Sequence, residues 1–568
     1  MRVTSNQPSV RQQAGAIQQL PKIGAKLALL VPPVIFITFF LIWPVATLIG
    51  RGLFSDGHID LAPALDLISR PRTWRLVRRT VGQAGAATII ATGLAVPLAK
   101  SLYLRRWPGR GLIKTLLTVP FVLPAVVVGL AFRLVFAQGG PLGWLHLDGS
   151  FAAVVAALVF FNLGLMVRVV GSFWVRLDPR PQQAARLLGA SPTRAFWSIT
   201  VRQLAPALAA GAALVFLFSA TAFATVLILG GAAYGTLETE IYLQTTGLLD
   251  LRTAAVLSVM QLLIVLGALW LAGAARRRHE RALHLKTGAG AVRRLAPPKR
   301  EDRLAMTVTL AAAGLTALPL AGLVAGSLRT AGGLSLGNYS RLATQPVPGL
   351  AITPVQALGR SLVVGLLAMT IAVGVGACTA AALSGQPRHR WLRRVRNILD
   401  SAFLLPAGIS AVTVGLGLFI TLSRPPLDLR GSFWLIPLAQ AVVALPLVTR
   451  ALLPALRAIG PGQREAAAVL GAGPWQVFKA VDLPIMARPL ALAAAYALAA
   501  SLGEFGATTF LARPESTTLP VAIYQMMSRP GADNLGTALA AAVMLGTITS
   551  ALVAVAEARR PHLAGAAL

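Results

Sequence analysis

The heptapeptide Gln-Ala-Ala-Arg-Leu-Leu-Gly at residues 183–189 returns at residues 465–471 as Glu-Ala-Ala-Ala-Val-Leu-Gly. The offset is 282 residues, the difference between 465 and 183. The same offset relates further residues: Phe121 to Phe403, Pro124 to Pro406, Arg168 to Arg450, Phe223 to Phe505 and Tyr242 to Tyr524. Matches in one fixed register indicate an internal duplication in which both copies kept their length.

The composition is that of a membrane protein. Of the 568 residues, 56% are hydrophobic and only 12% are charged, and the mean hydropathy is +0.70. Such a chain has too little polar surface to cover a soluble globule of its size. Apolar runs of roughly 20 residues, enough to cross a bilayer, lie at 27–50, 79–99, 114–136, 151–173, 204–229, 253–274, 304–327, 360–384, 397–422, 432–456, 487–512 and 535–557.

These runs predict an all-α polytopic membrane protein of about twelve transmembrane helices, arranged as two tandem six-helix repeats. Each repeat would carry one copy of the heptapeptide in a loop that couples the membrane unit to a partner. The expected organisation is an N-terminal tail (1–24), a first unit (25–275), a basic linker (276–303), a second unit (304–558) and a C-terminal tail (559–568).

The net charge of +33 is unevenly distributed among the loops. Arginine and lysine concentrate after the second run, in the central linker and after the eighth run, whereas the loop at 137–150 carries none. The positive-inside rule therefore predicts that both termini and the linker are cytoplasmic. The arginine-rich end of the loop at 51–78 is an exception. Basic loops that lie against anionic membrane lipid account for the charge without any nucleic-acid partner.

Several chemistries have no support in the sequence. Cys378 is the only cysteine, the six histidines lack metal-ligand spacing, and the chain has no G-x-x-x-x-G-K-[ST] loop to hold ATP phosphates. We therefore expect no catalytic residue, metal site or cofactor in this chain. Any ATP and its Mg would be held by a partner ATPase.

The repeated heptapeptide has the signals of a helix, a turn and a second helix. In the first copy Pro179 or Pro181 can begin a helix after Asp178, and Gly189 can end it in a left-handed conformation. Pro461 and Gly471 stand at the corresponding places in the second copy. Paired alanines between these signals leave a smooth face that can enter a groove on another protein.

The second copy resembles the EAA motif of permease subunits of bacterial type I ABC importers. In this motif E-A-A is followed by a glycine and then by an apolar residue before L-P, which here read Glu465-Ala466-Ala467, Gly471, Val481 and Leu483-Pro484. The first copy departs from the motif at Gln183 and at Val201-Arg202. The resemblance implies that these residues dock the ATPase: Gln183, Ala184, Ala185, Gly189, Glu465, Ala466, Ala467 and Gly471.

Further expectations follow from this resemblance. Two copies of a cytoplasmic ABC ATPase would grip the two loops and hydrolyse ATP, so the chain itself would be a non-enzymatic transport subunit. An extracytoplasmic substrate-binding protein would deliver the solute. The chain would lie in the bacterial cytoplasmic (inner) membrane.

Permeases with both halves fused on one chain resemble the thiamine and ferric-ion importers, over residues 25–557. The segments 160–163 and 223–231 are most similar to the thiamine permease, whereas 503–508 and 518–524 are more similar to molybdate and sulfate permeases. Thiamine or its phosphates are therefore the first expectation for the substrate. Ferric ion and an oxyanion remain as alternatives.

Polar residues at membrane depth are candidates for the substrate pathway, because they are unfavourable in lipid. Serine and threonine can instead bond to their own helix, phenylalanine can simply fill a core, and an acid can pair with Arg168 or Arg450. The polar candidates are Asn162, Thr225, Ser501 and Glu504. Phe223 and Phe505 are added because their rings could stack on an organic solute.

An ion-coupled secondary transporter can also have twelve spans in two repeats. Such carriers often place a short charged signature after the second span, but residues 100–110 lack its Gly and Asp pattern. The repeated loops would also have no purpose in such a carrier. A lipid-processing membrane enzyme would need a cluster of titratable groups, and only scattered ones occur.

Overall fold

The computed structural model describes residues 28–55, 58–231, 233–282, 295–384, 393–394, 408–422, 428–429, 431–459 and 461–558. Within these residues the chain is almost entirely helical, which confirms the predicted all-α class. The strands form two short antiparallel hairpins. In the first, Phe54 pairs with Ile59, and in the second Arg329 pairs with Leu334. Both predicted tails lie outside the described residues.

The first half contains the elements α3 (Val31–Ile37), η1 (Thr38–Ile42), α4 (Trp43–Leu53), β1 (Phe54–Ser55), β2 (His58–Ile59), α5 (Ala62–Ser69), α6 (Pro71–Leu104), α7 (Arg110–Val122), α8 (Ala125–Phe136), η2 (Gly143–Leu145), α9 (Phe151–Trp174), α10 (Arg180–Leu187), α11 (Pro192–Ala195), η3 (Phe196–Val201), α12 (Arg202–Ala220), α13 (Ala224–Gly230), α14 (Leu237–Tyr242), η4 (Leu243–Gly247) and α15 (Leu251–Ala282). Of the short turns, η1, η3 and η4 are π-helical.

The second half contains the elements η5 (Arg300–Asp302), α16 (Arg303–Leu328), β3 (Arg329–Thr330), β4 (Gly333–Leu334), α17 (Gly337–Thr344), α18 (Pro354–Ser384), α20 (Ala411–Thr421), α21 (Leu435–Ala458), α22 (Pro461–Val469), α23 (Pro474–Val477), η7 (Phe478–Asp482), α24 (Leu483–Leu502), α25 (Thr508–Leu511), η8 (Pro514–Ser516), α26 (Leu519–Ser528) and α27 (Ala532–Ala558). The π-helical turn η7 begins 282 residues after η3, so the duplication extends to local backbone geometry.

Ten helices within the described residues are long and apolar enough to cross a membrane. The pair α7 and α8 would make an eleventh span, but its two helices are bent by 110°. The apolar run predicted at 114–136 is thus a bent pair of helices. Its break has a local cause: Pro124 disfavours helical backbone at Leu123, which is extended with φ −65° and ψ 140°. The predicted span 397–422 lies partly outside the described residues, and α20 is its described part.

The fifth span of each half is followed by a break and a short helix. Helix α12 ends at Ala220 and α13 starts at Ala224, whereas α24 ends at Leu502 and α25 starts at Thr508. The apolar runs predicted at 204–229 and 487–512 thus each include such a break, after a span that is long enough to cross a membrane by itself. Non-helical backbone is tolerated within a membrane where protein buries it or where it lines a cavity.

The two halves exchange their first helices. Helix α16, which opens the second half, packs on α6, α7 and α8 of the first half. In the other direction α4 packs on α20 and α3 packs on α18. One large apolar core accordingly draws residues from both halves. The chain is therefore a single interlocked unit.

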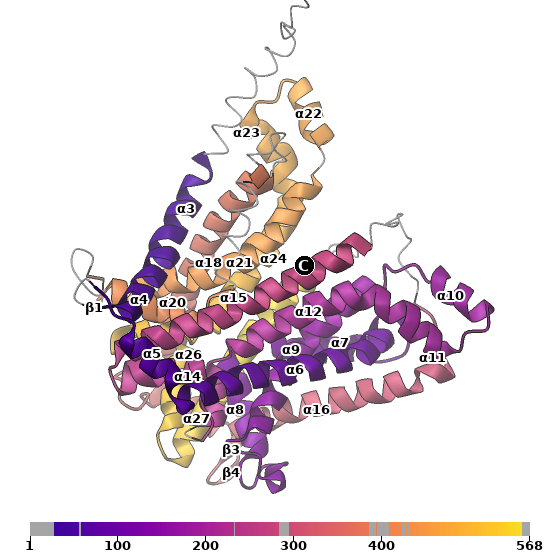
Figure 1. Cartoon of the computed structure of the whole chain (residues 1–568). Helices are drawn as coiled ribbons and strands as arrows, with labels where there is room; N and C mark the ends of the chain where they lie inside the picture. Colours follow the sequence, from indigo (N-terminus) through magenta and orange to yellow (C-terminus); the bar gives the residue numbers. More distant parts are fainter. Residues whose placement is uncertain are drawn as a thin grey trace, which may run out of the picture.

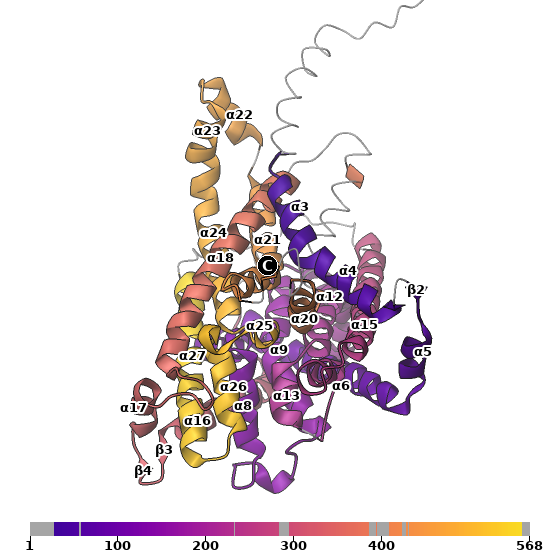
Figure 2. The ribbon, with the colours of Figure 1, turned by 90° about the vertical axis from the view of Figure 1, so that its left-hand side faces the viewer.

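The repeated loops, of which residues 178–202 and 461–484 are described, project from the bundle. Figure 1 shows α10 and α11 at the right of the molecule and α22 and α23 at its top. In Figure 2 the pair α22 and α23 stands at the far end of α24, and the β3–β4 hairpin lies at the opposite end of the molecule. Helix α10 has no buried residue, whereas the return segment of each loop packs on the core, through Phe196 in the first loop and Val481 in the second.

Candidate functional site

Each repeated loop is a short helix closed by a left-handed glycine. Gly189 has φ +89° and Gly471 has φ +84°. The amide of Ala190 donates to Ala185 O at 3.0 Å, and the amide of Ala472 donates to Ala467 O at 3.1 Å. In addition, the Gly189 amide donates to Arg186 O and the Gly471 amide donates to Ala468 O. The two bonds at each helix end define a Schellman cap. The predicted role of both glycines as helix ends is confirmed.

The starts of the loop helices also follow the sequence signals. Pro179 precedes α10 and the Asp178 carboxylate accepts the amide of Arg180 at 3.0 Å. Ser191 caps the second helix by accepting the amide of Arg194 at 3.2 Å. Short-range chemistry therefore determines the shape of the loop.

Apolar side chains on both loops are almost fully exposed within the part of the chain that the structure describes. Leu188 is 89% exposed, and its equivalent Leu470 is 88% exposed. Their neighbours Leu187 and Val469 are equally exposed. The predicted docking residues share this surface: Gln183, Ala184, Gly189, Glu465, Ala466 and Gly471 are exposed, and Ala185 and Ala467 are half-buried. Two equivalent apolar patches on a membrane protein's projecting loops are typical of a protein interface.

The two loops are stabilised differently. In the second loop the Arg464 guanidinium binds the Asp482 carboxylate at 2.7 Å, which ties α22 to η7. The corresponding residues of the first loop are Gln182 and Thr200, which cannot form an ion pair. There Arg186 instead lies 3.7 Å from Glu301 at the end of the linker.

An aromatic cluster fills the boundary between the halves at membrane depth. We define it as Phe223, Tyr242, Phe505 and Tyr524. The rings of Phe223 and Phe505 stack with centroids 5.5 Å apart. Within each half the geometry is repeated: Phe223 lies 5.4 Å from Tyr242, and Phe505 lies 5.4 Å from Tyr524. Sequence reasoning singled out the two phenylalanines but missed the tyrosines, which the offset of 282 would have indicated.

Buried amide and hydroxyl groups form a matched pair of contacts beside the interrupted spans. Asn162 Nδ2 donates to Ser219 Oγ at 3.3 Å in the first half. In the second half Ser501 Oγ donates to Gln440 Oε1 at 2.5 Å. Both contacts join the fourth span to the fifth. Gln440 was not predicted, because its partner is distant in sequence.

Two of the predicted pathway residues bind their own surroundings. Thr225 donates to Ala125 O at 3.2 Å. The Glu504 carboxylate accepts the amides of Ala507 at 2.8 Å and Thr508 at 2.9 Å, and it also accepts the Thr508 hydroxyl. Glu504 thus caps α25. Arg168, which the sequence offered as a possible partner for it, instead pairs with Glu557 at 2.9 Å.

Glu238 is a second buried acid that sequence reasoning did not select. It is fully buried on α14, and Ser410 Oγ of the second half donates to its Oε2 at 2.7 Å. Its Oε1 has no hydrogen-bond partner among the described residues. The structure therefore holds a carboxylate at the boundary of the halves with only half of its acceptors used.

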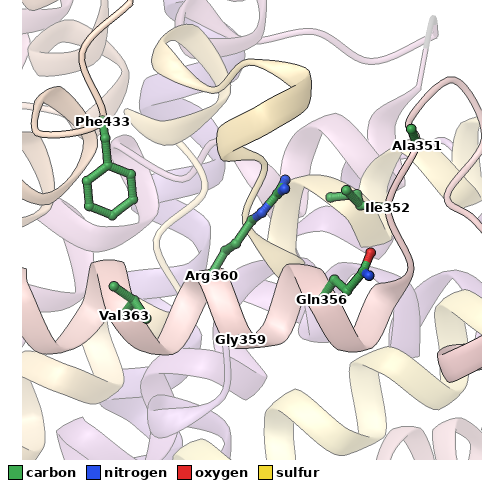
Figure 3. A pocket seen from close by; sticks show the side chains of 7 residues that line it. All are labelled: Ala351, Ile352, Gln356, Gly359, Arg360, Val363 and Phe433. Atoms are coloured by element: carbon green, nitrogen blue, oxygen red, sulfur yellow. The ribbon is translucent and has the colours of Figure 1, made fainter.

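Figure 3 shows a groove elsewhere on the molecule, along α18. It has a volume of about 550 Å³. The Arg360 side chain projects beside it and donates to Pro514 O at 3.2 Å. The groove contains none of the predicted pathway residues; it is lined by Ala351, Ile352, Gln356, Gly359, Arg360, Val363 and Phe433.

Duplicated helical membrane units with projecting, equivalent loops are typical of an importer permease of the ABC class, a multi-pass protein of the bacterial inner membrane. The chain belongs to the family of binding-protein-dependent transport system inner membrane components, whose model matches it twice, at residues 89–280 and 372–563. The two matches begin 283 residues apart, which agrees with the offset found in the sequence. The recognition of a fused, two-half permease is thereby confirmed.

Known relatives share this organisation over most of their length. The thiamine transport system permease protein ThiP of Brucella abortus (strain 2308) is 28% identical over 536 residues, which cover 90% of this chain and 93% of the relative. ThiP of Escherichia coli (strain K12) is 27% identical and covers 80% and 83%. A probable ABC transporter permease, y4fN of Sinorhizobium fredii, is 26% identical and covers 95% and 97%.

Proposed function

We propose that this chain is the membrane subunit of an ATP-driven importer that carries thiamine or its phosphates into the cytoplasm. A substrate-binding protein delivers the solute on the extracytoplasmic side, and two copies of an ABC ATPase bind the repeated loops inside. Both termini then lie in the cytoplasm. The ATPase holds the ATP and Mg, and this chain performs no chemistry.

The observation that carries the proposal is the equivalent exposure of Leu188 and Leu470 on two rigidly capped loops. Burial of each leucine in a partner's groove would contribute roughly 1.5–3 kcal/mol. Because the two patches are related by the repeat, they fit two copies of one partner. The rigid caps at Gly189 and Gly471 allow each loop to transmit a partner's movement to the span that follows it.

Two observations support thiamine as the substrate. ThiP proteins of four genera match the chain over most of its length. In addition, the aromatic cluster offers ring faces at the boundary of the halves, and thiamine carries two aromatic rings that can stack on them. Ferric ion and oxyanions have no ring to use these faces.

The docking half of the proposal is tested by purifying the tagged chain from its native membrane in mild detergent. We expect a Walker-type ATPase to co-purify at about two copies per chain. The double variant Leu188→Glu with Leu470→Glu should lose it. Leu334→Glu is the matched control, because Leu334 is 77% exposed on the hairpin at the opposite end of the molecule. Equal ATPase recovery from all three would contradict docking through these loops.

The transport half is tested in vesicles that contain the purified complex, the binding protein and ATP. We expect uptake of labelled thiamine that needs all three. Competition by ferric ion or molybdate but not by thiamine phosphates would indicate one of the alternative substrates. Uptake that follows an ion gradient and persists without the ATPase would instead identify a secondary transporter.

A further inference from the structure

We propose that Glu238 recognises the positive charge of the transported solute as it passes between the halves, with the aromatic cluster holding the ring that bears this charge. The inference rests on the proposed function and deepens it. It assigns the solute to the organic cations with an aromatic ring, a class that includes thiamine with its thiazolium. It also names the residue of this chain that selects for charge.

Glu238 is placed where a bare charge is unfavourable. Its side chain is 0% exposed, and Ser410 Oγ donates to it at 2.7 Å. The Gln261 side chain on the neighbouring helix α15 also lies against the Glu238 carboxyl group, and its amide nitrogen donates to Ala220 O at 2.9 Å. Oε1 of Glu238 is left without a hydrogen-bond partner among the described residues. Ser410 and Gln261 are thus the polar neighbours of Glu238 among the described residues, and neither is a cation, which a buried carboxylate normally has as a partner when it lacks several donors.

Helix α14 links Glu238 to the aromatic cluster. Glu238 and Tyr242 are four residues apart on α14, hence on one face of that helix. Tyr242 contacts Phe223, which stacks on Phe505. On the other side, Ser410 caps helix α20 at its N-terminus. The first residue of that helix, Ala411, packs closely on Gly506: a Cβ added to Gly506 would lie 3.1 Å from the Ala411 Cβ.

Contacts between the two halves cover both the Glu238 carboxyl group and the aromatic cluster. Phe223 with Phe505 is one such contact, and Ser410 with Glu238 is another. The contacts Phe223 with Tyr242 and Phe505 with Tyr524 lie within one half each. If the halves part, the stacked faces and the Glu238 carboxylate are therefore uncovered together, while each half keeps its own aromatic pair.

An uncovered carboxylate beside aromatic faces suits one kind of ligand. Ring faces carry a negative quadrupole that attracts cations, and a flat cationic ring can also stack on them. The other acids nearby are already used. Glu504 accepts from Ala507 and Thr508, and Glu240 binds Arg72 at 3.1 Å.

The experiment compares Glu238→Gln with the control Glu240→Gln in vesicles that hold the complete importer. Two probes are used: thiamine, and an analogue in which a neutral thiophene replaces the thiazolium. Uptake of each probe is divided by the wild-type uptake of that probe, so that any preference of the binding protein cancels. Uptake is also normalised to the amount of assembled complex.

We expect Glu238→Gln to lower normalised thiamine uptake about tenfold, the size of effect that a lost charge contact of about 1.4 kcal/mol produces, and to leave normalised uptake of the neutral analogue near wild type. Glu238→Asp, which keeps the charge but shortens the reach to Ser410, should retain more thiamine uptake than Glu238→Gln. In the Glu240→Gln control, the normalised uptake of thiamine and that of the neutral analogue should be equal.

Three outcomes would contradict the inference. If the Glu238→Gln variant carried as much thiamine as the wild-type complex, Glu238 would make no charge contact with the solute. If the variant lost uptake of both probes equally, Glu238 would be a purely structural residue. In both cases the proposed function stands as long as the wild-type complex itself carries thiamine. A wild-type complex that carries no thiamine would contradict the proposed function and the inference together.

Discussion

Phe223 and Phe505 occupy equivalent positions in the two repeats, and their rings stack on each other with planes 19° apart. A residue that contacts its own repeat equivalent lies on the pseudo-twofold axis of the duplicated protein. The translocation pathway of a two-unit permease is expected to follow this axis. The stacked pair is buried, at 6% and 2% exposure, so it blocks the axis at membrane depth in this conformation.

We expect the substitutions Phe223→Leu and Phe505→Leu to be non-additive. Each substitution removes one ring of the stack. The second substitution should therefore lower the free energy of unfolding by less when the first is already present. An aromatic pair contributes roughly 0.5–1.5 kcal/mol beyond its buried area. A double-mutant cycle on the unfolding free energy of the detergent-solubilised protein measures this coupling. The pair Phe223→Leu with Phe151→Leu is the control and should be additive, since Phe151 packs on Tyr234 instead.

The left-handed glycine of the second loop provides another test. Alanine at position 471 would meet nothing within 4 Å, so its cost is purely that of the backbone at φ +84°. That cost is about 1–2 kcal/mol. Gly471→Ala should therefore loosen the loop and reduce both ATPase co-purification and uptake.

Gly462→Ala is the matched control for this prediction. Gly462 lies in the helix α22 of the same loop, and a Cβ there would also meet nothing within 4 Å. Alanine is the better helix former, by roughly 0.5–1 kcal/mol, so this variant should bind the ATPase at least as well as wild type. Equal losses in the two variants would mean that loop surface, not backbone conformation, sets the effect.

The loops were predictable from sequence because their structure is local. Proline at the helix start, glycine at its end and serine at the next cap each act on backbone groups within a few residues. The break at Leu123 is also local, and Pro124 was its signal. Hydrophobicity alone merged both sides of that break into one span, because a sharp bend leaves the apolar run unchanged.

The membrane-depth contacts were harder to predict because they join distant segments. The offset relates Phe223 to Phe505, but equivalence under a repeat does not say that two residues touch. Glu504 was singled out as an acid in an apolar run, and its use by the amides of Ala507 and Thr508 depends on the break after α24. Glu238 went unnoticed because Ser410, its partner, is 172 residues away.

A polar network joins the halves on one side. Arg168 of α9 binds Glu557 of α27 at 2.9 Å, and the Tyr496 hydroxyl donates to the same carboxylate at 2.6 Å. The repeat equivalents of Glu557 and Tyr496 are Ala275 and Leu214, so the repeat does not supply Arg450 with the same carboxylate and hydroxyl. This contact is therefore an asymmetric link within an otherwise duplicated frame.

We expect Glu557→Ala to lower the free energy of unfolding more than the double variant Arg168→Met with Glu557→Ala does. The single change leaves a partly buried guanidinium without its carboxylate, at a cost of about 1–3 kcal/mol. The double change removes both charges and keeps much of the apolar contact. Unfolding free energy in detergent measures the difference. A double variant less stable than the single one would show that the arginine has another essential partner.

The linker provides a buried ionic anchor at the end of the molecule near the first repeated loop. Asp302 is 0% exposed and binds Lys100 at 2.8 Å and Arg105 at 2.7 Å. The amide of Ala296 donates to Leu104 O at 3.1 Å, so the linker backbone also pairs with the first half. The next helix, α16, packs on the first half beyond this anchor.

Asp302→Asn should destabilise the whole chain because it leaves two basic side chains beside a neutral amide. Loss of one partner in a buried ion pair costs about 3–5 kcal/mol. Glu301→Gln is the control, because Glu301 is partly exposed and lies 3.7 Å from Arg186. We expect lower yield of folded Asp302→Asn protein and earlier unfolding in detergent, with Glu301→Gln near wild type. If Glu301→Gln were the more harmful change, the linker would act on the first repeated loop rather than as an anchor of α16.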